Sequence, residues 1–286
     1  AIHLDTIVVG CPEDGNAEGA VYVFDRQMSG AWTETAKLVA ATRVAGDGLG
    51  ISVALIDGTI VAGAVGDDVG GEEDAGAVHI FTRNGMGVWS SGTALRAQTP
   101  ARVDWFGRAV AIDGSWLAVG AFGDSQGQPG SGAAYLFEKD VISGAWIQRR
   151  KLKSATPTPY ANFGFAVSMN GSLLAVGSYS DNDIATWSGA AHVYVRDASG
   201  AWSQEAKLKA PAPAENTHFG QTVSVHGDLL AVGIPFDSLG GPPPNDAGAV
   251  HVFRRAGIGT WSLEETIVAS TRSVNDLFGW SVALYG

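Results

Sequence analysis

The stretch WFGRAVAIDG at residues 105–114 decides the fold of this chain, because versions of it recur along the whole sequence. The other versions are GLGISVALIDG (48–58), NFGFAVSMNG (162–171), HFGQTVSVHG (218–227) and LFGWSVALYG (277–286). One tryptophan per repeat keeps nearly the same interval, with spacings of 57, 57, 56 and 59 residues between Trp32, Trp89, Trp146, Trp202 and Trp261. A period of this length indicates a solenoid, propeller or array, so most recurring residues belong to the architecture.

Each repeat contains four short runs that are typical of β-strands. In the second repeat these runs are residues 51–56, residues 59–64, residues 77–81 and the segment from Trp89 to about Ala97. Asp57-Gly58 separates the first two runs and is a two-residue hairpin signal. Gly or β-branched residues interrupt every stretch that is long enough for a helix. We therefore expect one four-stranded antiparallel sheet per repeat.

The second and third runs of each repeat are apolar on both faces, so their sheet must be covered on both sides. Stacking the repeats around an axis covers both faces, which predicts an all-β chain folded as a five-bladed β-propeller. The first run carries small residues on one side, and small side chains fit where strands converge on an axis. These small pairs are Ser52/Ala54, Ala109/Ala111, Ala166/Ser168, Thr222/Ser224 and Ser281/Ala283.

The repeats fill residues 1–286, which predicts a single β-propeller domain without a linker. The chain stops at residues 284–286, where the first hairpin should turn, and residues 1–10 supply a second strand without a first. We therefore expect residues 278–284 to pair with residues 6–10. This pairing would join residues 1–47 and 278–286 into one composite blade and close a ring of five blades. The alternative is an excerpt from a larger ring that is cut at equivalent points.

Charge and composition exclude several classes of partner. The net charge of −11 argues against a protein that binds a nucleic-acid backbone, which requires clustered Lys and Arg. The same charge disfavours adhesion to anionic lipid. No apolar run approaches the ~20 residues that a membrane span requires. We therefore expect neither a nucleic-acid partner nor insertion into a membrane.

The pairing of Phe-Gly and a small-residue strand with a later Gly-Ala-Val-Tyr/His-Val-Phe resembles FG-GAP repeats, which form the propellers of integrin α-subunits. The resemblance covers the whole chain and implies a β-propeller, a family that hosts adhesion modules, lectins and enzyme appendages. Many members carry a calcium loop between the first and second strands. Here the corresponding turns, such as Asp57-Gly58 and Asn170-Gly171, are too short to supply the six to eight oxygens that Ca²⁺ takes. The family's calcium sites therefore do not carry over to this chain.

The loops between the second and third strands, which we call the 2–3 loops, vary most among the repeats. They span residues 11–19, 64–76, 121–132, 178–189 and 234–248. Together they hold 13 of the 29 acidic residues and no Lys or Arg. Antiparallel order places them on one face of the disc, together with the connections from each fourth strand to the next first strand, which we call the 4–1 loops. This arrangement predicts a strongly acidic face.

One aspartate recurs at the same place in every 2–3 loop: Asp14, Asp67, Asp124, Asp181 and Asp237. It either provides a ligand or cation site in each blade or holds an Asx-type turn through backbone N–H groups. Five identical placements beside five different loop sequences favour the turn. The cluster of Asp67, Asp68, Glu72, Glu73 and Asp74 appears once and is a weak candidate for calcium, against the simpler interpretation of a solvated acidic loop. We otherwise expect no metal site.

Two off-register tryptophans mark the best candidates for a ligand site. Trp105 lies in a 4–1 loop beside Asp104, and Trp187 lies in a 2–3 loop near Asp181, Asn182 and Asp183. A flat apolar ring beside polar groups suits a sugar or a docked protein, although loop packing explains both residues as well. Tyr22, Tyr135, His79, His192 and His251 share one place on the third strand, for which we favour a structural role over a metal site.

No nucleophile–base constellation and no cofactor motif is present in the sequence. We therefore expect a secreted or cell-surface, non-catalytic module for binding or adhesion. It would recognise a protein or glycan, with a cationic ligand as one form, through the acidic face of variable loops. The alternatives are a carbohydrate-active enzyme or its accessory domain, and a structural module of a larger extracellular assembly.

Overall fold

The computed structural model describes residues 1–238 and 246–285. Residues 239–245 of the last 2–3 loop and residue 286 of the predicted composite blade lie outside the described residues. The chain forms two compact units, residues 1–124 with 135–151 and residues 125–134 with 152–286. Among the described helices, none is long and apolar enough to cross a membrane. The single-domain assignment stays a prediction.

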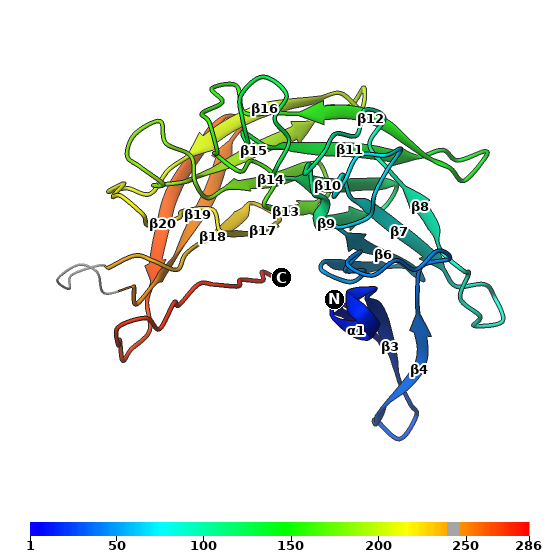
Figure 1. Cartoon of the computed structure of the whole chain (residues 1–286). Helices are drawn as coiled ribbons and strands as arrows, with labels where there is room; N and C mark the ends of the chain where they lie inside the picture. Colours follow the sequence, from blue (N-terminus) through cyan, green and yellow to red (C-terminus); the bar gives the residue numbers. More distant parts are fainter. Residues whose placement is uncertain (239–245, 286) are drawn as a thin grey trace. The chain divides into compact units, whose positions relative to one another are not determined.

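The described residues form five four-stranded antiparallel sheets, each made from strands that follow one another in the chain (Figure 1). The first sheet contains β1 (Ile2–His3), β2 (Thr6–Cys11), β3 (Ala20–Arg26) and β4 (Trp32–Leu38). The second contains β5 (Val53–Ile56), β6 (Thr59–Ala64), β7 (Ala77–Thr82) and β8 (Thr93–Leu95). The third contains β9 (Phe106–Asp113), β10 (Trp116–Ala121), β11 (Ala133–Lys139) and β12 (Trp146–Leu152).

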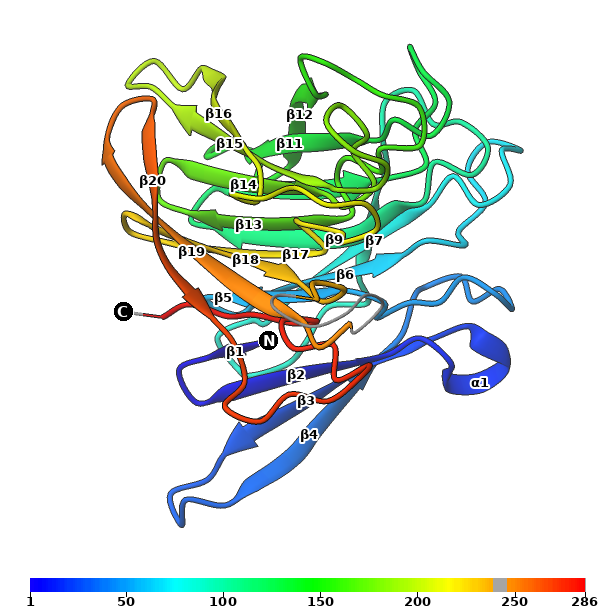
Figure 2. The same cartoon turned by 90° about the vertical axis from the view of Figure 1, so that its left-hand side faces the viewer.

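The fourth sheet contains β13 (Ala166–Asn170), β14 (Leu173–Ser178), β15 (Ala190–Arg196) and β16 (Trp202–Leu208), which lie side by side in Figure 2. The fifth contains β17 (Thr222–His226), β18 (Leu229–Ile234), β19 (Ala249–Gly257) and β20 (Thr260–Ile267). The one described helix, α1 (Asp14–Ala17), spans four residues and includes non-helical backbone at Gly15 and Asn16. The predicted all-β class and four strands per repeat are therefore confirmed.

The hairpin between the first and second strands turns in two residues, as predicted. Asp57 and Gly58 connect β5 to β6 with φ values of 42° and 69°. Positive φ at both central positions is the geometry of a type I′ turn, whose twist matches that of the flanking strands. The short turn sets the register, because Ile56 then pairs with Thr59 and Val53 with Ala62.

The Phe-Gly motif joins each repeat to the one before it. Phe163, for example, forms a parallel bridge with Gly132, and Phe219 forms the same bridge with Gly189. A Cβ on Gly189 would lie 2.1 Å from the carbonyl oxygen of Phe219, so a side chain has no room there. The phenyl rings of Phe163 and Phe219 are fully buried. The recurring glycines are therefore places where two segments of backbone touch.

The second strands of the second, third and fourth sheets lie inside their sheets and are buried on both faces, whereas β2 of the first sheet is only partly buried. Every residue of β6, β10 and β14 is buried. Within each compact unit, these strands contribute to apolar clusters that join successive repeats, as Val23 with Ile60 in the first unit and Val193 with Val232 in the second. The expected covering of both faces is therefore confirmed for β6, β10 and β14.

The first sheet differs from the predicted composite blade. Ile2 pairs with Ile7 and His3 with Thr6, so the first residues of the chain already occupy this edge of β2. Residues 282–285 at the other end lie outside any strand. β1 could not be predicted from the sequence, because a strand of two residues is too short to show an alternation of apolar and polar residues. Closure of a ring stays a prediction.

Candidate functional site

The aspartate that recurs in the 2–3 loops is bound by cations from its own chain. In each of the first four repeats this aspartate pairs with a Lys or Arg that lies in or next to the fourth strand of the same sheet. The pairs are Asp14 with Lys37, Asp67 with Arg96, Asp124 with Lys151, and Asp181 with both Lys207 and Lys209. The carboxylate thus ties the variable loop to the outermost strand.

Asp67 shows the electrostatics of this contact. Its side chain is 8% exposed, with Oδ1 lying 3.3 Å from Nη2 of Arg96 and Oδ2 lying 3.6 Å from Nε2 of His79. Burial alone would raise the pKa of this carboxyl group. The polar contact with His79 and the charge of Arg96 outweigh burial and hold the pKa of Asp67 below its usual range. The aspartate is therefore ionised and already neutralised.

In the first three repeats the tyrosine or histidine of the third strand contacts the same aspartate. The Tyr22 hydroxyl donates a hydrogen bond of 2.5 Å to Asp14, and the Tyr135 hydroxyl donates one of 3.2 Å to Asp124. His192 is fully buried and packs edge-on against Phe163, with 4.9 Å between ring centroids. Burial and these contacts support a structural role for this position.

The fourth repeat has a doubled version of the ion pair. Nζ of Lys209 lies 2.6 Å from Asp181, while Nζ of Lys207 lies 3.0 Å from Asp181 and 2.6 Å from Asp183. Lys209 also pairs with Asp183. Burial would raise the pKa of Asp183, but hydrogen bonds, including those from both lysines, hold that pKa far below its usual value. Two positive charges therefore balance two negative charges.

These contacts revise the two interpretations of the recurring aspartate. The structure supplies a cation in the first four repeats, and that cation is a side chain of the protein rather than a ligand. The sequence analysis missed these partners, although a signal was present: Lys37, Lys151 and Lys207 each stand five residues after the periodic tryptophan. Because Lys and Arg in or next to the fourth strands pair with these loops, the sequence of the loops alone overstates the negative charge of this face.

The acidic loop at residues 64–76 is also engaged within the chain. Asp68 accepts a hydrogen bond from the backbone of Asp74, and Glu72 accepts one from the backbone of Arg102. Glu73 forms an ion pair of 2.8 Å with the Arg102 guanidinium. Within residues 1–238 and 246–285, no three His, Cys, Asp or Glu side chains converge as a metal site would require. Four carboxylates of this cluster therefore contact other parts of the loop region: Asp67 contacts Arg96, Asp68 contacts Asp74, and Glu72 and Glu73 both contact Arg102.

Asp104 and Trp105 have structural contacts in the first compact unit. Asp104 is 3% exposed and accepts a hydrogen bond of 2.9 Å from the backbone of Ala101. The Trp105 ring is half-buried and stacks on Phe122, with centroids 4.7 Å apart. Loop packing therefore accounts for both residues.

Trp187, in the second compact unit, has a different environment. Its indole is 47% exposed, and its backbone N–H donates a hydrogen bond of 2.7 Å to Oδ1 of Asn182. The nearest aromatic contact is edge-on with His218, at 6.2 Å between centroids. The structure thus brings Asn182 and Trp187 together and holds the backbone of Trp187 while much of its ring faces solvent.

Asn182 also connects Trp187 to the neighbouring 4–1 loop. Its Nδ2 donates to the carbonyl of Pro159 at 3.4 Å, and its backbone N–H donates to Oγ1 of Thr158 at 3.3 Å. Tyr160, the residue after Pro159, is 64% exposed. An exposed tyrosine and an exposed tryptophan therefore lie on two loops that one asparagine joins. Tyr160 was not singled out from the sequence, because only the fold places its loop beside residues 182–187.

The comparisons with known proteins agree with this architecture. No curated protein matches the chain. A family model described as the FG-GAP repeat matches residues 32–81, 89–137, 146–194 and 202–253. Each matched segment begins at a periodic tryptophan and ends in the third strand of the next sheet, so the model covers the joined repeats described above. With more than half of its residues matched, the chain belongs to the FG-GAP repeat family.

Proposed function

We propose that this protein is a non-catalytic binding module that recognises a glycan or a protein through the loops around Trp187. The observation that carries the proposal is the identity of this residue at a periodic position. Trp187 stands two residues before the glycine that precedes the third strand and has a φ of 51°. The corresponding residues in the other repeats are Ala17, Asp74, Gly130 and Asp246. The fold therefore needs no tryptophan at this place.

The backbone conformation at this position makes a tryptophan energetically unfavourable there. Its carbonyl accepts the N–H of His218 at 3.1 Å, just as Asp74 accepts the N–H of Trp105 in an earlier repeat. That contact requires the left-handed conformation, which is a genuine outlier for a bulky side chain. Such strain costs on the order of 1–3 kcal/mol and gathers at functional sites. A residue that adds strain and exposes an indole is best explained by what the indole contacts outside the chain.

The surroundings of Trp187 suit a sugar ring or a protein side chain. The exposed faces of Trp187 and Tyr160 offer flat apolar surface with a polar tip, and Ile184 adds an apolar side chain that is 60% exposed. Asp183 lies in the same loop and is neutralised by Lys207 and Lys209. Aromatic contact, rather than net negative charge, is therefore the principal chemistry that we propose for this surface.

Recognition of a cationic ligand has less support from the paired charges than it had from the sequence alone. At least seven of the 13 acidic side chains in the 2–3 loops pair with Lys or Arg: Asp14, Glu18, Asp67, Glu73, Asp124, Asp181 and Asp183. Binding to a cationic partner would weaken with added salt, whereas stacking on an aromatic ring is much less sensitive to salt. The salt dependence of binding therefore separates the two.

The decisive experiment is a glycan array and a pull-down with the Trp187→Asp variant. Aspartate occupies the same position in two other repeats, so we expect the variant to fold. Loss of at least about 2 kcal/mol of binding free energy, roughly thirtyfold in affinity, is expected when an aromatic anchor is removed. Met28→Ala removes a fully exposed apolar side chain elsewhere and serves as the matched control. Binding that survives Trp187→Asp and Tyr160→Ala together would refute this site.

FG-GAP repeats are typical of extracellular proteins and form propeller modules that often bind partners or build structures. We propose an extracellular or cell-surface location on that basis. Secretion of the tagged chain by its native host, measured in culture medium and on intact cells, tests the location. Retention of the whole pool inside the cell would contradict it.

A further inference from the structure

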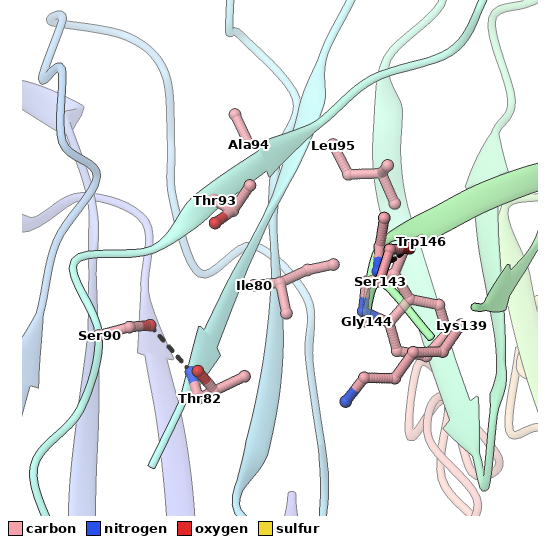
Figure 3. A pocket seen from close by; sticks show the side chains of 11 residues that line it. Ile80, Thr82, Ser90, Thr93, Ala94, Leu95, Lys139, Ser143, Gly144 and Trp146 are labelled. Carbon is pink, nitrogen blue, oxygen red and sulfur yellow. Dashed lines mark hydrogen bonds between the residues drawn. The ribbon is translucent and has the colours of Figure 1, made fainter. Parts of the chain in front are cut away.

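A cavity of about 520 Å³ lies at the outer part of the second and third sheets, within the first compact unit. Figure 3 shows Ile80, Thr82 and Thr93 on one side of this cavity, with Lys139 and Trp146 on the other. The lining thus combines an indole, an ammonium group and side-chain hydroxyls. It is separate from the loops around Trp187.

The same position between the first and second sheets is filled by an internal carboxylate. Arg83 ends the run HIFTR (79–83) as Lys139 ends YLFEK (135–139), so the two cations are equivalent. Nη1 and Nη2 of Arg83 donate to the two carboxylate oxygens of Asp25 at 3.1 and 2.8 Å. Hydroxyls of Thr6 and Thr35 donate to the same carboxylate at 2.7 and 2.8 Å. Asp25 belongs to the preceding repeat.

A second carboxylate fills the equivalent position between the fourth and fifth sheets. Arg255 donates to both carboxylate oxygens of Glu205, at 2.8 and 2.5 Å. Nε1 of Trp261 donates to the same group at 2.9 Å, and the Glu205 side chain is 1% exposed. Trp261 is the periodic tryptophan that corresponds to Trp146. In both places, therefore, a strand-three cation binds a carboxylate of the preceding repeat.

The second repeat lacks both of these acids. Thr82 stands where the first repeat has Asp25, and Gly92 stands where the fourth has Glu205, three residues after the periodic tryptophan. Gly92 has a φ of +82°, and a Cβ there would lie 2.7 Å from Cε1 of Phe81, so no side chain fits. The short β8 strand, with three residues where β16 has seven, leaves further room.

Lys139 is consequently a cation without its anion. Its ammonium group forms no ion pair with any residue in the described part of the chain and lies 6.0 Å from the centroid of the Trp146 ring. The neighbouring Asp140 accepts hydrogen bonds from the backbone N–H groups of Ile142 and Ser143 and belongs to the turn. The cavity thus contains the cation of an ion pair, whereas the carboxylate that completes this ion pair is present at Asp25 and Glu205.

We propose that this cavity binds a small sugar acid, whose carboxylate takes the place that Asp25 and Glu205 fill elsewhere. The ammonium of Lys139 would donate to the carboxylate, and charge-assisted bonds of this kind are among the stronger polar contacts. The sugar ring would lie against Trp146 and Ile80, with its hydroxyls facing Thr82 and Thr93. A plain fatty acid would leave those threonine hydroxyls without partners.

The test is calorimetric titration of the full chain with glucuronate and, in parallel, with glucose. We expect saturable binding of glucuronate and at least about tenfold weaker binding of glucose, since loss of one charged contact corresponds to about that factor. Lys139→Met should weaken glucuronate binding by a similar factor, and Lys139→Arg should retain it. Absence of glucuronate binding, or equal binding of the two sugars, would overturn the proposal.

Two further variants separate binding from folding. Thr82→Asp restores an acid at the Asp25 position, so it should abolish glucuronate binding without lowering the melting temperature. Arg26→Gln changes the equivalent cation of the first repeat, which is half-exposed, and should leave the affinity unchanged. Undiminished glucuronate binding by Thr82→Asp or Lys139→Met would place the ligand elsewhere and refute this site.

Discussion

His192 is of a residue type that often binds metals, but here it packs inside the protein core. Its ring is fully buried, and its Nδ1 lies 3.4 Å from Nε2 of Gln204. Burial, followed by the charges of Lys207 and Lys209, lowers the pKa of His192 to about 3. The histidine is therefore neutral at any physiological pH.

This neutral histidine predicts a specific loss of stability in mild acid. In the unfolded chain its pKa is about 6.5, so between about pH 6.5 and about pH 3 the unfolded state binds a proton that the folded state does not. Stability should therefore fall as pH falls through this window, by up to about 1.4 kcal/mol per pH unit. His192→Tyr, which installs the residue of two other repeats, should lack this component.

Urea unfolding at about pH 7.5 and about pH 5 checks the prediction, because the pH-dependent part is a difference within each variant. The wild type should lose more free energy of unfolding than His192→Tyr over this interval. The carboxylates near the site are present in both proteins, so their contribution cancels in the comparison. Equal losses in the two proteins would contradict the assigned role of His192.

At the level of secondary-structure elements, the contact between the Phe-Gly segment and the third strand explains most of the constant spacing between the repeats. Gly177 lies against the carbonyl of Gly220 and Gly233 against that of Gly279, so successive first and second strands approach through glycine. Small residues of the first strands complete the contact: the Ser168 hydroxyl accepts the N–H of Val225 at 3.0 Å, and that of Ser224 accepts the N–H of Leu284 at 2.9 Å. Within the second unit, the first strands therefore converge as predicted.

This geometry predicts that the glycines of the chain differ in their importance for stability. Gly189→Ala should destabilise the fold by about 2–4 kcal/mol, because its Cβ would collide with backbone and its φ of +79° disfavours any side chain. Gly257→Ala should change stability by less than about 1 kcal/mol, because a Cβ there meets nothing within 4 Å. Thermal and urea unfolding of both variants measures the difference. Similar losses in the two would show that the close approach is not what requires glycine.

At the scale of the whole molecule, the sequence predicts that this chain lacks the calcium loops carried by many members of the FG-GAP repeat family. The turn at Asp57-Gly58 is two residues long, and its register leaves no loop that could surround an ion. Internal ion pairs and backbone bridges carry the connections between strands instead. We therefore expect that folding does not depend on calcium.

Chelation tests this expectation on the whole chain. The melting temperature in excess EDTA should match that in millimolar calcium, because a bound ion would stabilise by about 2.7 kcal/mol at a hundredfold excess over its Kd. Differential scanning calorimetry of the same preparation in the two buffers makes the comparison. A rise of several degrees with calcium would reveal a site that neither the turns nor the acidic loop at residues 64–76 suggest.

The candidate sites were less predictable than the fold. The sequence predicts one candidate site that contains Asp181, Asn182, Asp183 and Trp187, and these residues lie together in the structure. The two aspartates, however, form ion pairs with Lys207 and Lys209. Those lysines are more than 20 residues away in the sequence and meet the loop only because β16 pairs with β15. The cavity at Lys139 was not predicted, because its defining feature is an acid that is absent.

The sequence by itself determined the repeat, the all-β class, the two-residue hairpins and the positions where glycine is needed. It could do so because strand alternation, turn chemistry and a constant period are local properties, and five copies average out the exceptions. Only the tertiary structure decided which charges remain available and which are already paired. That decision depends on which strands lie side by side, so Asp67 is neutralised by Arg96 while Lys139 has no carboxylate in the described part of the chain.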